Sequence, residues 1–295
     1  MFTHEDRVIT HRQAMQFAVI AHRLTETNHA LATLGWGGAR SRLLTPRQAL
    51  LRLGAGDVAL NRLDVSTDLD GVEEGIWSIT QLEAQGVRVL NRPPALLACH
   101  DKLLAARILA AHGVPHPRTR RLETPASADG LRYPVVAKPR FGSWGRDVEL
   151  CCDREALAWY VAEMESRSWW SIGGVVQELV RPLGIDLRVV VAAGEVVGAA
   201  TRTAAPGEWR TNVAIGGTPS RAVPSKDARE LAVEATRALG IDFAGVDLLP
   251  SDDGWIVLEV NGAVDVRPLY SLEGDVYMAV LRSLRRTASE SIVLA

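Results

Sequence analysis

The residues best suited to chemistry in this chain are two carboxylates and an amide near its C-terminal end. Asp247 interrupts the apolar run FAGVDLL, and Glu259 and Asn261 follow in the run WIVLEVN. Side chains two residues apart on a strand share a face, which places Glu259 and Asn261 together. If residues 252–254 form a three-residue loop with Gly254 in the left-handed conformation, Asp247 lies directly opposite Glu259 on the neighbouring strand.

Such an arrangement is typical of a site for a hard cation. Two facing carboxylates repel each other unless a cation lies between them. The last histidine of the chain is His116, so the cation would be bound by oxygen atoms alone. Such ligands favour Mg²⁺, with Mn²⁺ as an alternative ion. A solvated polar face is the competing interpretation, but both carboxylates lie inside apolar runs. We therefore predict that Asp247, Glu259 and Asn261 bind Mg²⁺.

A glycine-rich loop in the middle of the chain is suited to binding an anion. The sequence RFGSWGR, residues 140–146, begins two residues after Lys138. Gly142 and Gly145 let the backbone approach a ligand closely, and successive N–H groups form an anion-binding concavity. The Ser143 hydroxyl adds a donor, and Lys138 supplies positive charge. A simple hairpin turn is an equally open interpretation. No GxxxxGK[ST] motif occurs, which excludes a P-loop enzyme.

Lysine is rare in this chain, because Lys102, Lys138 and Lys226 are the only lysines among 33 basic residues. A GC-rich coding sequence explains such a skew toward arginine. Where arginine is the default cation, a retained lysine indicates a position that needs a compact ammonium on a flexible stem. Lys138 is such a candidate because of its place before the loop, whereas Lys226 fits a solvated residue at a helix start.

Further polar residues follow the loop in the order Asp186, Arg188, Arg202, Arg210 and Asn212. Asp186 and Arg188 share a strand face in GIDLRVVV. Cationic and amide groups beside a metal site can stabilise phosphoryl oxygens in a transition state. For each arginine the competing interpretation is a surface ion pair. Arg62, which ends a strand-like run, is a candidate for binding a substrate carboxylate, against an ordinary surface arginine.

The elements that must position these residues alternate between short apolar runs and helical patterns. In the first third, strands are expected at 16–21, 57–60 and 87–91 and helices at 25–34 and 74–85, which predicts a small α/β domain with parallel strands. Residues 91–94, NRPP, read as a linker. Beyond them we expect helices at 96–112, 154–166 and 226–239, strands at 134–139 and 147–151, and hairpins pairing 186–192 with 195–201 and 243–249 with 255–261.

Composition limits the classes of protein to consider. The chain has 295 residues, a formal charge of −2, and 47% hydrophobic and 23% charged residues. These values predict a soluble globular protein of two or three domains, and they argue against nucleic-acid binding. Three cysteines support neither a disulfide framework nor a zinc site. Neither a membrane span nor the apolar core of a signal peptide is evident, so we expect a cytoplasmic protein without membrane attachment.

Taken in order, these features resemble a known family. The sequence carries Lys102, then AKP with Lys138, GSWGR, QELV, DLR, WRTN, GVDLL and EVN. This order and spacing resembles the ATP-grasp superfamily and, within it, the RimK-type and LysX-type amino-acid ligases. The resemblance covers nearly the whole chain and is strongest from about residue 88 to 262. It implies an ATP-grasp fold of mixed α/β and α+β class. The units would be an N-terminal α/β domain at 1–93, a central subdomain with a phosphate-covering loop at 94–176, and a metal-binding subdomain at 177–295.

The resemblance also implies roles for residues. Lys102 and Lys138 would contact the phosphates of ATP, and the loop with Gly142, Ser143 and Gly145 would cover them as a lid. The adenine would be lined by Gln177, Glu178, Leu179 and Val180, with Asp186 near the ribose. Arg210 and Asn212 would contact phosphate or an acyl intermediate. Asp247, Glu259 and Asn261 would hold Mg²⁺, in agreement with the hairpin argument.

The implied activity is ATP-dependent ligation of a carboxylate to an amine through an acyl phosphate. A RimK-like enzyme would add glutamate or another amino acid to a small molecule or carrier protein, and a LysX-type enzyme would act on a carrier protein in lysine biosynthesis. A non-catalytic ATP-binding module is the remaining alternative. After EVN the chain reads GAVDVRPLY, which matches neither branch, so both substrates stay open, as does homo-oligomer formation.

Overall fold

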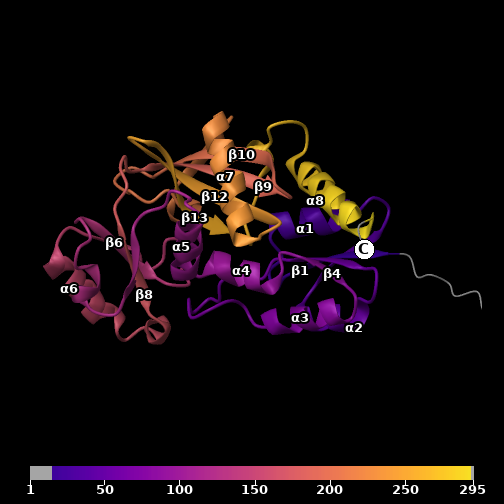
Figure 1. Ribbon diagram of the computed structural model, residues 1–295, viewed down its shortest axis with the longest axis horizontal. Coiled ribbons are helices and arrows are strands. Elements are labelled where there is room, and N and C mark those ends of the chain that lie inside the picture. Colours follow the sequence, from indigo (N-terminus) through magenta and orange to yellow (C-terminus); the bar gives the residue numbers. More distant parts are fainter. Residues whose placement is uncertain (1–14, 294–295) are drawn as a thin grey trace, which may run out of the picture.

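The computed structural model of the chain describes residues 15–293, with side chains described as far as residue 287. The strands of this part form three sheets (Figure 1). In Figure 1 the unit with β6, β8 and α6 lies at the left, the N-terminal unit with β1 and β4 at the lower right, and the C-terminal sheet with α7 above. The expected mixed α/β architecture is confirmed.

The N-terminal sheet is parallel, in the order β2 (Arg40–Leu44), β1 (Gln16–Ile20), β3 (Val58–Asn61), β4 (Arg88–Leu90). Its helices are α1 (Glu26–Leu34), α2 (Pro46–Arg52) and α3 (Ile76–Ala84). β2 and α2 were not expected, because the polar edge strand RSRLL lacks an apolar alternation. A signal for α2 is nevertheless present: Thr45 and Gln48 form a capping box, with a proline at the first helical position.

The central sheet is antiparallel, in the order β5 (Thr119–Leu122), β8 (Gly174–Glu178), β6 (Val135–Pro139), β7 (Glu149–Cys151), and α6 (Arg154–Met164) packs against it. The C-terminal sheet runs β11 (Thr218–Arg221), β10 (Glu195–Thr203), β9 (Ile185–Ala192), β12 (Phe243–Ser251), β13 (Gly254–Asn261). The helices α7 (Lys226–Leu239) and α8 (Val276–Val293) complete this unit. The boundary expected at residue 176/177 falls inside β8, so the central unit is better ended after β8.

The single helix expected at 96–112 is two helices, α4 (Pro93–His100) and α5 (Lys102–Ala111). Asp101 separates them with an extended backbone, and its carboxylate accepts hydrogen bonds from the N–H groups of Leu103 and Leu104 at 3.1 Å. Arg140 holds the same carboxylate with two hydrogen bonds of 2.7 and 2.5 Å. An N-cap of this kind stabilises a helix start, and here it fixes Lys102 as the first residue of α5.

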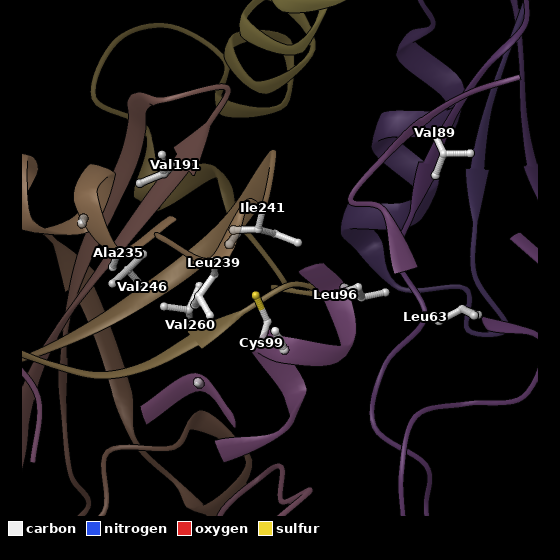
Figure 2. Packing of buried hydrophobic residues seen from close by; sticks show 14 of the residues in the cluster. Leu63, Val89, Leu96, Cys99, Val191, Ala235, Leu239, Ile241, Val246 and Val260 are labelled. Carbon is white, nitrogen blue, oxygen red and sulfur yellow. The ribbon is translucent and has the colours of Figure 1, made fainter. Parts of the chain in front are cut away.

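Two apolar cores join the N-terminal and C-terminal units. In the first, Leu96 and Cys99 of α4 pack with Leu239 and Val260, and Figure 2 shows the Cys99 side chain directed from α4 toward Leu239. The second core packs Leu31 of α1 with residues of α8, which lies beside α1 in Figure 1. The N-terminal and C-terminal units therefore bury apolar surface against each other in two separate cores.

Asn91 contradicts the expectation of a linker at 91–94. Its side chain is fully buried and its φ is +53°. The amide donates to the carbonyl oxygens of Phe243 (2.8 Å) and Gly262 (3.1 Å), and its oxygen accepts from the N–H groups of Asp242 and Phe243 at 3.1 and 2.8 Å. One side chain thus satisfies four backbone groups of the C-terminal unit and fixes how β4 meets it.

Replacing Asn91 should therefore destabilise the whole protein. Asn91→Ala leaves buried donors and acceptors without partners, and we expect a loss of ~2–4 kcal/mol in the free energy of unfolding. Urea denaturation followed by circular dichroism measures this loss. Gln85→Ala, at an exposed amide of the same unit, is the matched control. Equal stability of the two variants would show that the Asn91 contacts are not structural.

No helix in the described residues is long and apolar enough to cross a membrane.

Candidate active site

A cleft between the central and C-terminal sheets brings together most of the residues selected from the sequence. Its walls include, from the predicted set, Lys102, Lys138, Gly142, Ser143, Gly145, Gln177, Glu178, Leu179, Val180, Arg210, Asn212, Asp247 and Glu259. The non-protein space in the cleft is about 920 Å³. Four predicted residues do not line it: Arg62, Asp186, Arg188 and Asn261. Residues that the sequence reasoning did not select also contribute, among them Trp209, Thr211 and Leu258.

Two lysines face the carboxylates of this cleft. Lys102 Nζ lies 3.6 Å from Glu259 Oε2 and donates to the Gly142 carbonyl at 2.5 Å. Lys138 lies on β6 and is buried. Burial, followed by the nearby charge of Lys102, lowers the pKa of Lys138 to about 8. Burial in the apolar strand VVAKP thus disfavours the charged form of Lys138. A negatively charged ligand in the cleft would stabilise that charge.

Asp247 pairs with Glu259 across β12 and β13, as the sequence predicted. The reason given for that register was wrong. Ser251 pairs with Gly254 around a two-residue turn, not a three-residue loop, and a β-bulge at Leu258 shifts the later pairs by one. The bulge adds the residue that the turn omits, so the two differences cancel and the carboxylates still face each other.

Two arginines hold Asp247 in place. Arg188 Nε and Nη2 each donate to the carboxylate at 2.7 Å, and Arg202 Nη2 lies 2.8 Å from Oδ2. Burial alone would raise the pKa of Asp247, but the charges of Arg188 and Arg202 outweigh it and lower the pKa to about 2. Asn261 Nδ2 lies 3.4 Å from the same carboxylate. Arg188 therefore acts on Asp247 from behind the cleft wall and does not face the space expected for a substrate.

Asp186 is also placed behind the wall. Its two oxygens accept from Arg202 at 2.7 and 2.5 Å, and the Thr211 hydroxyl donates to it as well. Burial raises its pKa despite these partners. The side chain is 1% exposed. Arg202 donates to both carboxylate oxygens of Asp186 and lies between this side chain and the cleft. The position of Asp186 therefore gives no support to the ribose contact that the resemblance implies.

Arg62 is buried and does not line the cleft. Its Nε donates to Asn28 Oδ1 at 2.5 Å, its Nη2 donates to the Val264 carbonyl at 2.7 Å, and its guanidinium lies 5.2 Å from the centre of the Phe243 ring. Burial lowers the pKa of Arg62 to about 10. The sequence pattern of a strand end was read correctly, but the C-terminal unit covers that end.

The segment 177–180 crosses the cleft, with its polar side chains bound to protein. Gln177 donates to Thr119 Oγ1 at 2.7 Å. The Glu178 carboxylate accepts from Arg118 at 3.1 Å and from the Arg132 N–H at 3.0 Å. All four residues line the cleft, and the apolar side chains of Leu179 and Val180 offer a surface suited to a flat apolar ring.

Arg210 and Asn212 contact the glycine-rich loop from the C-terminal side. Arg210 binds the Glu208 carboxylate at 2.7 and 3.0 Å and donates to the Gly145 carbonyl at 2.9 Å. Gly145 has φ +70°, and a Cβ there would lie 3.1 Å from Asn212 Oδ1. Glycine is therefore favoured both by the backbone conformation and by the close approach of Asn212.

The donor set at Asp247 and Glu259 fits a divalent cation. Asp247 is ionised, and among the described contacts Glu259 has only Lys102 at 3.6 Å, so lone pairs remain for a ligand. Burial would raise the pKa of Glu259, but the charges of Lys102, Lys138 and Arg188 together outweigh it and keep the pKa below its ordinary value. Within residues 15–293 no cluster of three or more His, Cys, Asp or Glu residues forms a complete cage. The set therefore suits an ion that shares ligands with a phosphorylated substrate.

Comparisons with known proteins agree with this geometry. A family model described as the RimK-like ATP-grasp domain matches residues 99–283. The chain is 36% identical over 200 residues to a probable alpha-L-glutamate ligase of Parasynechococcus marenigrum strain WH8102, a match that covers 66% of this chain and 42% of that protein. A probable alpha-L-glutamate ligase of Xanthomonas euvesicatoria pv. vesicatoria strain 85-10 is 30% identical over 296 residues, 94% of this chain and 99% of its own length.

The fold has solved counterparts. A RimK domain ATP-grasp protein from Sphaerobacter thermophilus DSM 20745 superposes with a TM-score of 0.68 at 23% identity, covering 91% of this chain and 98% of that one. The first curated relatives are longer proteins, and the chain spans about half of their length.

Proposed function

The chain belongs to the RimK-like ATP-grasp family, and from this membership we propose that it is an ATP-dependent carboxylate–amine ligase. The observation that carries the proposal is that Lys102, Lys138, Asp247 and Glu259 line one cleft, where Lys102 Nζ lies 3.6 Å from Glu259 Oε2. Phosphate-binding cations and metal-binding carboxylates within one cleft are what transfer of a phosphoryl group to a carboxylate requires.

The reaction we propose begins with attack of a substrate carboxylate on the γ-phosphate of ATP, which releases ADP and forms an acyl phosphate. An amine then attacks the acyl carbon, phosphate leaves, and an amide remains. Lys102 and Lys138 bind and orient the phosphates. Residues 142–147, the part of the glycine-rich loop from Gly142 extended to Asp147, exclude water. Asp247, Glu259 and Asn261 would hold Mg²⁺, which when bound neutralises phosphate charge. Catalysis by positioning and charge neutralisation needs no histidine.

Other assigned contacts are proposals of the same kind. The adenine would lie against residues 177–180, and Arg202, which reaches the cleft, is better placed than Asp186 to meet the ribose or phosphates. Arg210 and Asn212 would act on phosphate mainly by holding the loop that covers it.

We infer that the amine is glutamate, because both curated relatives described above are named alpha-L-glutamate ligases. The acceptor would be a carboxylate on a small molecule or on a protein. The segment GAVDVRPLY after β13 differs from the continuation expected from the resemblance, and we propose that it helps to determine the acceptor.

A mass-spectrometric screen tests the proposal. Purified protein, ATP, MgCl₂ and isotopically labelled glutamate are incubated with a panel of carboxylates, and products that gain the mass of glutamate minus water are sought together with ADP. We expect at least one acceptor to give both. Tight ATP binding with background ADP release for the whole panel, including a cell extract as acceptor source, would favour a nucleotide-binding module without ligase activity.

A further inference from the structure

A segment of the N-terminal unit is built into the core of the central unit. Residues 64–73 leave the sheet after β3 and return, closed by a hydrogen bond of 2.8 Å from the Glu73 N–H to the Asp64 carbonyl. Val65 and Leu69 of this segment are buried together with Phe141 and other residues of the central unit. The two units, which lie on opposite sides of Figure 1, are therefore joined by the segment 64–73.

Arg23 connects both ends of this segment. It follows β1, and its guanidinium binds Asp64 Oδ2 at 3.1 Å, Glu73 Oε1 at 3.0 Å and the Val65 carbonyl at 3.0 Å. These three contacts fix the plane of the guanidinium. The N-terminal unit therefore sets the orientation of the Arg23 side chain. One flat face of its guanidinium stays available for a further contact.

That face lies on Trp144 of the glycine-rich loop, with the guanidinium carbon 4.6 Å from the centre of the ring. The backbone of Trp144 has φ +57°, a conformation that residues other than glycine rarely adopt. Contacts with the surrounding structure are needed to maintain it. Beside it, Arg146 donates to the Thr67 carbonyl of the segment 64–73 at 2.7 Å. The loop over the cleft is thus held from the N-terminal unit, while Arg210 holds it from the C-terminal unit.

We propose that Arg23 is a positioning residue of the ligase: through Trp144 it keeps the loop 142–147 closed over the phosphates, so that closure depends on the N-terminal unit. Arg23 itself touches neither ATP nor the reacting atoms. The inference rests on the function proposed above for this cleft. An acyl phosphate under a closed loop meets only the amine, whereas under an open loop water attacks the acyl carbon, the carboxylate is regenerated and phosphate leaves.

Loosening this contact should therefore uncouple ATP use from amide formation. Trp144→Leu keeps every ion pair of Arg23 and removes the aromatic face on which its guanidinium lies, together with part of the packing of Trp144 against the core of the central unit. In full-length protein with Mg²⁺ and a non-hydrolysable ATP analogue, we expect hydrogen exchange of the loop amides to become about fivefold faster, the factor that a cation–π contact of ordinary strength supplies. In turnover, the ratio of ADP to amide product should rise above one.

A double-mutant cycle separates positioning from general destabilisation. Arg23→Ala and Trp144→Leu act on one contact. The loop amides of the double variant should therefore exchange no faster than those of the faster-exchanging single variant. Trp144→Phe, which keeps a ring face, should restore most of the protection. Arg107→Ala, at an exposed arginine of α5, is the control for loss of a positive charge.

Additive effects in the cycle, or loop exchange in Trp144→Leu equal to wild type, would overturn the proposal. The exchange experiment needs only nucleotide binding. A wild-type protein that forms no amide but shows the expected cycle would therefore refute the ligase function while supporting the loop contact, and the reverse pattern would refute the loop contact alone.

Discussion

Replacing Glu259 with glutamine is expected to abolish ADP formation while leaving the fold intact. The carboxylate faces Asp247 across β12 and β13 and is kept ionised by the nearby cations, with Lys102 the nearest of them. The amide that replaces it has no charge with which to hold a divalent cation. Losing one electrostatic group that acts on the transferring phosphoryl group costs about 100- to 1000-fold in rate. Steady-state ADP release with a working acceptor measures this loss.

The control for this variant is Glu273→Gln, which removes the same charge at an exposed position outside the cleft. Both variants should unfold at the wild-type temperature, because glutamine keeps the size of the side chain. Turnover of Glu259→Gln within a few-fold of wild type would remove Glu259 from the metal site.

Lys138→Met should lose activity and gain stability. Lys138 is buried with its pKa lowered to about 8, so the fold opposes its charged form. This cost is fully present below pH 8 and falls as the pH rises from 8 toward the ordinary lysine value. Methionine removes it, and the free energy of unfolding at pH 7 should rise by up to about 3 kcal/mol. The rate constant kcat/KM for ATP should fall by about 100-fold because a phosphate contact is lost.

The pH profile of the wild-type enzyme tests the same assignment. ATP needs the charged form of Lys138, so kcat/KM for ATP should decrease about tenfold per pH unit above pH about 8. The bound phosphates raise the pKa of Lys138, so kcat itself should stay constant to higher pH. Lys138→Arg should be weakly active, since a planar guanidinium misplaces the phosphates, and should lack this alkaline decrease. Lys226→Met, at an exposed lysine, is the control. If kcat/KM of Lys138→Arg still decreased above pH about 8, the decrease would belong to a group other than Lys138.

The sequence predicted the parts of this site that depend on local pattern. The apolar strand that carries Lys138, the glycine-rich loop after it and the pairing of Asp247 with Glu259 all follow from alternation over a few residues, and the structure confirms each as an element. The ATP-grasp architecture followed from the order of short motifs along the chain.

The parts that the sequence did not predict depend on contacts between units. Nothing local indicates that Arg62 is covered by the carbonyl of Val264, or that Asn91 binds Phe243, because both partners lie more than 150 residues away in the chain. The bulge at Leu258 is set by pairing with a neighbouring strand and has no clear signal of its own. The break at Asp101 did have one, since an aspartate within an apolar helical run is a typical N-cap.

We propose that ATP activates a carboxylate as an acyl phosphate in this cleft. An accepted carboxylate labelled with ¹⁸O in both oxygens, supplied with ATP, Mg²⁺ and glutamate, tests it directly. We expect that each amide formed is accompanied by one labelled oxygen in the released inorganic phosphate. Unlabelled phosphate, or label found in AMP, would contradict it.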